Sequence, residues 1–222
     1  MTAKTYHHGN LSEALLDAAE QLLPARGAEA LTLREVAREA GVSHGAPYHH
    51  FGSREALLAA IAERGFEGLT AAMSSASGAT PRNQLIGICE AYVSFAIKHP
   101  TRFRLMFGPL LAQKEPYPEL QKAGQASFAV LLQAAEKVNH AEALPLALAG
   151  WSLAHGLAHL AIHAVLDSLP VPVPPGEVLA RQLAQWLLDS KTAPPDKRSR
   201  KPRTTPTPPT TSRSKKKAPS AL

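Results

Sequence analysis

The chain has a single cysteine, Cys89, among its 222 residues, so it cannot close an intramolecular disulfide. The absence of disulfides is typical of proteins in a reducing compartment, and we expect a cytoplasmic, nucleoid-associated protein. Cys89 lies among apolar residues with no basic neighbour to favour a reactive thiolate, which indicates packing rather than redox sensing.

The sequence also lacks the common catalytic motifs. It contains no glycine-rich phosphate loop, no nucleophile elbow and no His-Glu-x-x-His zinc motif. We therefore expect no enzymatic activity. No run alternates strictly between apolar and polar residues as a half-buried strand does, and glycine and proline recur at helix-length intervals. These patterns predict an all-α fold with about nine helices.

A third absence is local. Residues 144–166 contain no Asp, Glu, Lys or Arg. The stretch is long enough to span a bilayer. Pro145, Ser152 and three histidines interrupt it, however, and no second helix of similar hydrophobicity accompanies it. We expect no membrane segment, because a helix that is apolar all round is otherwise buried between layers or at a subunit interface.

Basic residues are concentrated at one end of the chain. Nine of its 24 lysines and arginines, but only one of its 18 acidic residues, lie after Thr192. The preceding part is therefore slightly acidic, and the net charge of +6 comes from the tail. Residues 191–222 are rich in Lys, Arg, Pro, Ser and Thr without aromatic residues, so we expect a disordered tail that attracts DNA irrespective of sequence.

Residues 32–51 predict two short helices joined by a tight turn. Thr32 and Glu35 have the spacing of a capping box, in which each side chain binds a backbone amide at a helix start. Gly41 is suited to the left-handed conformation that ends a helix, and Ser43 is suited to cap the second helix, over residues 43–50. Such a helix-turn-helix places its second helix in a DNA major groove, although many helical corners share the geometry.

Three sequence segments in and around the predicted helix-turn-helix favour a DNA-binding role over an ordinary helical corner. They are Tyr-His-His-Gly-Asn-Leu at residues 6–11, Val-Ser-His-Gly-Ala-Pro-Tyr-His-His-Phe at 42–51, and Ser-Arg-Glu-Ala-Leu-Leu at 53–58. In this order and spacing they resemble the N-terminal DNA-binding domain of the TetR family of bacterial repressors. The resemblance implies a head over residues 6–68, a helical effector-binding and dimerisation domain over 69–190, and the tail after them.

The resemblance also implies which residues face DNA. The recognition-helix positions are Ser43, His44, Gly45, Pro47, Tyr48 and His49. Thr32 would bring its hydroxyl and the helix N-terminus near a phosphate. Arg54 stands where the family usually has lysine, and either cation binds phosphate.

A looser resemblance covers residues 82–188. Trp151-Ser-Leu-Ala-His155-Gly156-Leu157 resembles the Trp-x-x-x-His-Gly signature of one TetR C-terminal subfamily, and residues 102–107 also resemble that subfamily. An inducer-binding, dimerising domain is implied. Bulky residues would line an apolar cavity, with plain core packing as the alternative. The candidates are Tyr92, Phe95, Phe103, Met106, Phe107, Trp151 and His155.

Three histidines form one ridge of the predicted helix, since His155, His159 and His163 are spaced four residues apart. Neighbouring histidines at this spacing can bind a metal or face a haem. No Cys, Asp or Glu lies on the ridge to complete a site, so we predict no metal and no cofactor. We expect His155 to make a buried hydrogen bond, and the other two to lie at a subunit interface or its solvent edge.

Together these features predict a homodimeric repressor. Its partners would be a palindromic double-stranded DNA operator and an unknown small-molecule effector that releases it, and the dimer would form through helices over residues 144–166 and 176–189. One alternative is an architectural protein that binds DNA mainly through its basic tail. Another is a protein that sequesters a ligand or senses a metal.

Overall fold

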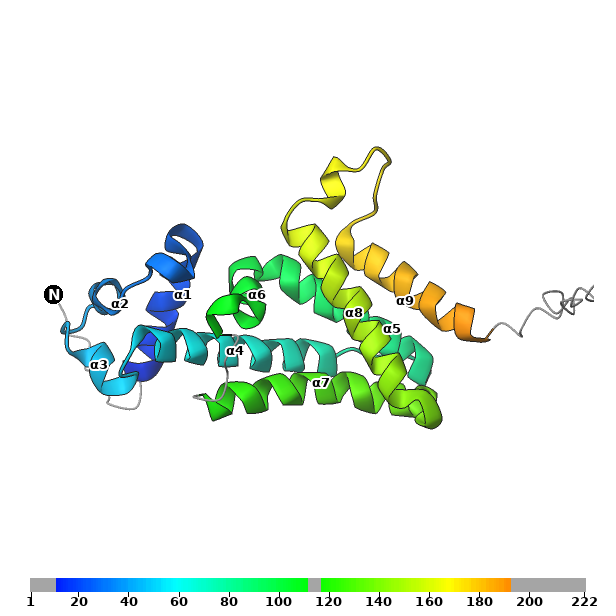
Figure 1. Ribbon diagram of the computed structural model, residues 1–222, viewed down its shortest axis with the longest axis horizontal. Coiled ribbons are helices and arrows are strands. Elements are labelled where there is room, and N and C mark those ends of the chain that lie inside the picture. The colour runs from blue at the N-terminus through cyan, green and yellow to red at the C-terminus, as the bar shows by residue number, and fades with distance from the viewer. Residues whose placement is uncertain (1–10, 112–116, 193–222) are drawn as a thin grey trace, which may run out of the picture. The chain divides into compact units, whose positions relative to one another are not determined.

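A computed structural model describes residues 11–111 and 117–192, and all regular structure in these ranges is helical, as predicted (Figure 1). The described ranges contain nine α-helices: α1 (Leu11–Ala30), α2 (Leu33–Glu39), α3 (Ala46–His50), α4 (Arg54–Ser74), α5 (Pro81–Lys98), α6 (Pro100–Phe107), α7 (Pro118–Val138), α8 (Ala143–Ile162) and α9 (Gly176–Thr192). The expected first residues of the head, 6–10, and the basic tail after Thr192 lie outside the described residues.

Helix α2 begins and ends as its sequence predicts. The Thr32 hydroxyl accepts a hydrogen bond from the Glu35 amide at 3.2 Å, and the Glu35 carboxylate accepts one from the Thr32 amide at 3.2 Å. At the other end Gly41 has a φ of 68°. The amides of Gly41 and Val42 donate to the carbonyls of Arg38 and Ala37, which is the Schellman pattern.

Helix α3 is shorter than predicted. It begins at Ala46 rather than Ser43, and Gly45 stands at its N-cap with no side-chain capping bond. The predicted Ser43 cap is therefore wrong. Pro47 explains the late start, because proline has no amide to donate and fits only the first turn of a helix. Residues 43–46 instead form a turn closed by a 3.0 Å bond from the Ala46 amide to the Ser43 carbonyl.

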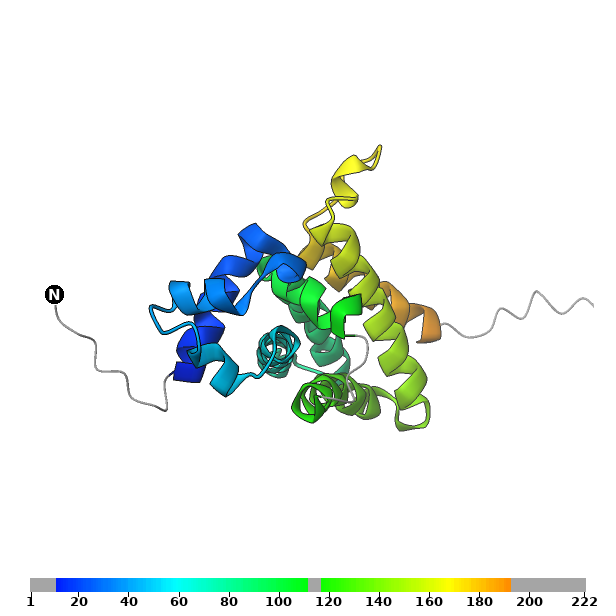
Figure 2. The same cartoon turned by 60° about the vertical axis from the view of Figure 1, so that its left-hand side comes forward.

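Helix α4 connects the head to the rest of the described chain. Ser53 caps it by accepting a hydrogen bond from the Ala56 amide at 3.1 Å. The helix runs without interruption across the expected domain boundary at residue 68 and packs on α1 before the boundary and on α5 and α7 around and beyond it. Figure 2 shows α4 and α7 side by side in a nearly end-on view. One continuous helix, α4, therefore links the head to α5 and α7.

Helices α5 to α7 form the layer around α4. Thr80 caps α5, accepting a hydrogen bond from the Asn83 amide at 3.1 Å, and Pro81 occupies the first turn. The short α6 lies against both α1 and α4. Its contact with α4 is close at Gly65, where a Cβ atom would lie 2.6 Å from the sulfur of Met106. Cys89 is buried, as predicted for packing, and burial raises the pKa of its thiol to about 12.

Helix α8 ends at Ile162 and does not reach residue 166 as predicted. The Ala164 amide donates to the Ala161 carbonyl and the Val165 amide to the Leu160 carbonyl, which repeats the Schellman pattern that ends α2. Ala164 consequently has a φ of 55°. The sequence carries no signal for this ending, because the left-handed position usually taken by glycine is an alanine.

This ending yields a stability prediction. Replacing Ala164 with glycine should raise the free energy of unfolding by about 1 kcal/mol, because the left-handed conformation strains alanine and not glycine. Thermal unfolding should show a melting temperature about 2 °C higher. The control is Ala126→Gly on the exposed side of α7, which should lower the stability by about 1 kcal/mol. A loss of stability in Ala164→Gly would contradict the assigned ending.

The segment His140–Ile162 is the one described stretch long and apolar enough to cross a membrane by length and composition, with a mean hydropathy of 1.2. Core helices of soluble proteins pass the same test. One side of α8 packs on α5 and α7. The other side leaves Leu144, Leu148 and Leu160 more than 40% exposed, so α8 is not buried all round as its composition suggests.

Candidate nucleic-acid interface and ligand cavity

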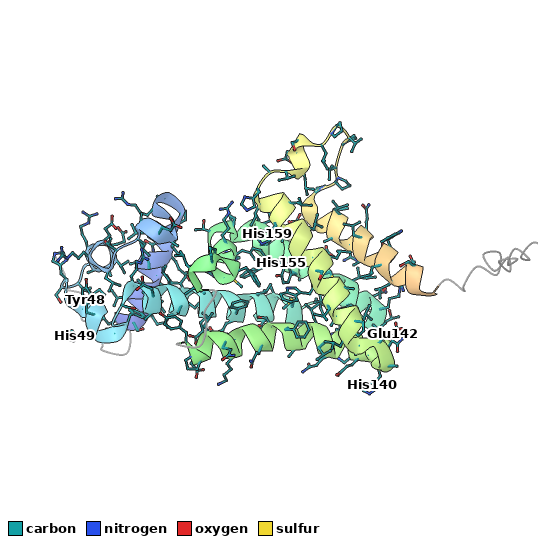
Figure 3. All side chains as sticks on the ribbon, viewed as in Figure 1. Tyr48, His49, His140, Glu142, His155 and His159 are labelled. Atoms are coloured by element: carbon teal, nitrogen blue, oxygen red, sulfur yellow. The ribbon has the colours of Figure 1, made fainter. Side chains whose placement is uncertain are left out.

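The turn before α3 and the outer face of α3 form an exposed surface, which we call the recognition surface. Its members are Ser43, His44, Gly45, Tyr48 and His49. Tyr48 is 52% exposed although it is a large aromatic residue. In Figure 3, Tyr48 and His49 lie near the start of α4 and away from His155 and His159 on α8. Donors, acceptors and an aromatic ring thus converge on one short helix and its entry turn.

Pro47 differs from the other predicted contacts because it is buried. Its ring packs inside the head, where it supports the first turn of α3. In this position the Pro47 ring supports α3 and is not presented to DNA.

The two predicted phosphate-binding side chains are already engaged within the head. The Thr32 hydroxyl lies 2.8 Å from Oε2 of Glu35, whose pKa is lowered mainly by this hydrogen bond. Arg54 donates to the Glu29 carbonyl at 2.5 Å and to Oε1 of Glu55 at 3.1 Å. A phosphate at either position must compete with a carboxylate, so the helix-start amides of α2 are the less obstructed donors.

The described part of the head is poor in positive charge. Residues 11–68 contain five arginines and nine acidic residues. One of the arginines, Arg64, contacts Glu13 at 2.7 Å, Asp17 at 2.8 Å and Glu20 at 3.8 Å, so it is not directed at DNA. The recognition surface has two histidines and no lysine or arginine. By formal charge, the described part of the head is net negative.

A cavity of about 400 Å³ lies behind the head, between α4, α5, α6, α7 and α8. Three of the predicted cavity residues line it, namely Tyr92, Phe107 and Trp151. Four do not line it, namely Phe95, Phe103, Met106 and His155. The sequence interpretation missed the contributions of α4 and α7. These are Phe66, Leu69 and Met73 from α4 and Gln121, Gly124, Gln125, Ser127, Phe128 and Leu131 from α7.

His155 does not line the cavity but contacts Tyr92, which does. Its Nδ1 atom lies 2.8 Å from the hydroxyl of Tyr92, which is a partly buried hydrogen bond where the sequence predicted a buried one. The same hydroxyl accepts a hydrogen bond from Nε1 of Trp151 at 3.2 Å. Burial lowers the pKa of His155 and raises that of Tyr92, so both groups favour their neutral forms. The hydrogen bonds fix the orientation of two aromatic rings that line the cavity.

The histidine ridge continues along α8 from His155 to His159 (Figure 3). The ring centroid of His159 lies 4.6 Å from that of His155 and 5.7 Å from that of Phe103. His163 is exposed and stacks on His159 at 6.0 Å. Within the described ranges no three His, Cys, Asp or Glu side chains gather as metal ligands would.

Helix α6 connects the cavity to the head. Phe107 lines the cavity, and next to it Met106 passes Gly65 of α4. Near the start of the helix Arg102 donates to Oε2 of Glu20 on α1 at 2.5 Å. The other carboxylate oxygen of Glu20 is buried with no hydrogen-bond partner. A shift of α6 would therefore change its contacts with both α1 and α4.

The lowered pKa of His155 predicts a pH dependence. The unfolded chain binds a proton at this histidine below about pH 6.5, whereas the folded protein resists it because of burial and, secondarily, the charge of His159. The free energy of unfolding should therefore fall as the pH drops below about 6.5. Chemical unfolding at about pH 7 and about pH 5 measures this fall. The free energy of unfolding should fall less between these pH values for His155→Gln than for the parent.

The control for this experiment is His140→Gln, because His140 is exposed at the far end of α7. The free energy of unfolding of His140→Gln should fall by as much as that of the parent. Some pH dependence should remain in His155→Gln, since burial also lowers the pKa of His99. Equal falls in His155→Gln and the parent would contradict the role given to His155.

Comparison with known proteins agrees with this arrangement. Residues 15–61 match the profile of bacterial regulatory proteins of the tetR family, and residues 85–186 match the profile of the tetracyclin repressor-like C-terminal domain. The HTH-type transcriptional regulator BetI of Rhizobium meliloti (strain 1021) is 40% identical over 87 residues. That alignment covers 37% of this chain and 41% of BetI, so the chain spans less than half of this curated relative.

Solved structures extend the similarity to most of the chain. A protein of unknown function from Rhodococcus sp. RHA1 is 34% identical, with a TM-score of 0.74, over 85% of this chain and 98% of that one. The TetR family transcriptional regulator PfmR from Thermus thermophilus shares the fold at 24% identity, with a TM-score of 0.59, over 79% of this chain and 97% of that one. The chain is thus a DNA-binding transcriptional regulator of the TetR family and not an enzyme.

Proposed function

We propose that the protein is a ligand-responsive homodimeric repressor that acts in the cytoplasm. The single observation that carries the proposal is α6, which lines the cavity through Phe107 and contacts α1 and α4 of the head through Arg102 and Met106. A ligand that binds better to one position of α6 than to another shifts the population of head positions. The heads would then no longer match the spacing of an operator.

The DNA-binding part of the proposal rests on the recognition surface. Ser43, His44, Gly45, Tyr48 and His49 would enter the major groove, where side chains read base edges. Amides at the start of α2 would contact a phosphate, as helix N-termini do. Two copies of the head would read two half-sites about one or more helical turns apart.

The proposed dimer forms through α8 and α9. Along α8 one ridge of exposed residues is spaced four apart: Leu144, Leu148, Ser152, Gly156 and Leu160. Its middle is small, and nothing lies within 4 Å of the position that a Gly156 side chain would take. On α9 Trp186 is 67% exposed. Apolar ridges with small central residues let two helices approach closely, so these surfaces suit a four-helix interface with their copies.

A charge on this ridge tests the dimer and the operator together. Leu148→Glu should convert the protein to a monomer in sedimentation experiments and should abolish binding to a palindromic site while leaving the helical content unchanged. Leu110→Glu is the matched control, since Leu148 and Leu110 are 41% and 40% exposed and Leu110 lies outside α8 and α9. A Leu148→Glu protein that remains a dimer refutes the interface.

The architectural alternative is not favoured, because the family assignment rests on the head and the cavity-bearing domain and neither profile includes the tail. We assign the tail an auxiliary role, which adds sequence-independent attraction to DNA. The domain limits we propose are residues 6–68 for the head, 69–190 for the effector and dimerisation domain, and 191–222 for the tail.

A further inference from the structure

Three polar groups of the cavity wall, on Tyr92, Trp151 and Ser127, have hydrogen-bond partners within the protein. The Tyr92 hydroxyl accepts a hydrogen bond from Trp151 and lies 2.8 Å from the acceptor-capable Nδ1 of His155. Ser127 donates to the Phe66 carbonyl at 3.0 Å and lies 2.6 Å from the hydroxyl of Thr70. The hydroxyl protons at the wall are therefore engaged in internal contacts. A ligand meets mostly aromatic and aliphatic carbon there.

Formal charge is missing from the same wall. The twelve described residues that line the cavity include no Asp, Glu, Lys, Arg or His. An isolated ion transferred into an apolar site loses its hydration and costs several kcal/mol unless a counter-charge or hydrogen bonds replace the water. This cavity therefore disfavours a carboxylate, a phosphate or a sulfonate.

An aromatic cage for a cation is the remaining charged possibility, and the ring geometry disfavours it. Phe66 and Phe107 meet edge to face, with centroids 5.2 Å apart and planes at 75°. Phe128 and Trp151 meet in the same way at 5.8 Å and 62°. A cation is held by several ring faces directed at one point. Here the rings cover one another's faces instead, as in a packed core.

We infer that the cavity binds an uncharged, largely apolar small molecule, oriented with any polar group toward Gln121 and Gln125. These two glutamines lie on the exposed side of α7 at the cavity mouth. Their amides supply both donors and acceptors to a ligand group that stays near water. The inference rests on the proposed effector role of the cavity and adds the chemical class of the effector.

Two pairs of probes test the class by charge alone. N-phenylnaphthylamine and its sulfonate, anilinonaphthalene sulfonate, share a ring system and fluoresce in apolar sites. In a Trp186→Phe background Trp151 is the remaining tryptophan, so energy transfer from it to the dye reports occupancy of the cavity. The uncharged dye should bind at least roughly tenfold more tightly than the sulfonate. Equal or tighter binding of the sulfonate would overturn the inference.

The second pair tests a cation. Neopentylbenzene and benzyltrimethylammonium have nearly the same shape and differ in one positive charge. Neopentylbenzene should displace the uncharged dye at a concentration at least roughly tenfold lower than the ammonium compound. Stronger displacement by the ammonium compound would show that the cavity is a cation cage and would overturn the inference.

A charge placed at the mouth tests the orientation. Gln125→Lys should strengthen binding of the sulfonate dye relative to the uncharged dye, because the new ammonium lies beside the mouth. Gln133→Lys on the same helix is the matched control, exposed but outside the cavity, and should change neither dye. Equal effects of the two lysines, or no effect of Gln125→Lys, would contradict the assigned mouth.

The probe measurements are made without DNA. Operator binding is measured separately, so failure of the ligand class and failure of the regulatory proposal can be distinguished. If the uncharged probes bind as expected but none weakens operator binding at saturation, the ligand class stands and the effector role fails. If the charged probes bind more tightly while the protein still selects an operator, the ligand class fails and the regulator stands.

Discussion

A variant with alanine at His44, Tyr48 and His49 is expected to lose specific operator binding by at least about 1,000-fold, while its binding to a scrambled duplex changes little. All three side chains are exposed and none belongs to the hydrophobic core, so the variant should unfold at the temperature of the parent. Each base contact is worth about 1–3 kcal/mol of discrimination, and the three losses compound. Titrations at fixed salt with both duplexes measure the effect.

The control for this variant is His140→Ala, which removes an exposed histidine at the far end of α7. It should leave the affinities for both duplexes unchanged. If the triple variant keeps the ratio between operator and scrambled DNA, then α3 does not read the bases and the recognition surface is wrongly assigned.

Deletion of residues 193–222 is expected to weaken binding to every duplex by roughly 10- to 1,000-fold at about 0.1 M salt, without changing the preferred sequence. The reason is the distribution of charge. The tail has nine basic residues and one acidic residue, whereas residues 11–68 of the head have more acidic than basic side chains. Each phosphate that a cation neutralises adds about 0.9 to the slope of log affinity against log salt, so the slope should become shallower by up to about 8.

The salt slope of the full chain and of the deleted chain on one operator checks this prediction. A chain in which all nine basic residues of the tail are replaced by serine separates charge from length and should behave like the deletion. Loss of discrimination between sites after deletion would contradict the auxiliary role of the tail and would favour the architectural alternative.

The head was the part most fully predicted from sequence, because its signals are local. The Thr32–Glu35 capping box and the turn at Gly41 depend on residues within a few positions of each other. The start of α3 was misplaced because Ser43 is a good N-cap residue in isolation. The position of Pro47 decided the outcome instead.

The cavity was predicted only in part, because its wall depends on how distant helices meet. Tyr92, Phe107 and Trp151 line it as expected, but Phe103 and Met106 point into the core between α4, α6 and α8. A residue that lines a cavity and one that packs in the core occupy the same positions in the apolar pattern of a helix, so the sequence does not distinguish them. Phe128 and Leu131 are three residues apart, which places them on one face of α7, but this spacing does not show that the face borders a cavity.

The measurement that most directly tests the account is selection of bound DNA from a random library, with the full chain and the chain lacking residues 193–222 side by side. We predict that both proteins enrich the same palindrome, with half-sites about one or more helical turns apart, and that the shorter chain needs lower salt. Enrichment of a palindrome by neither protein, with DNA retained only by the full chain, would contradict the claim that two copies of the α2–α3 head read an operator.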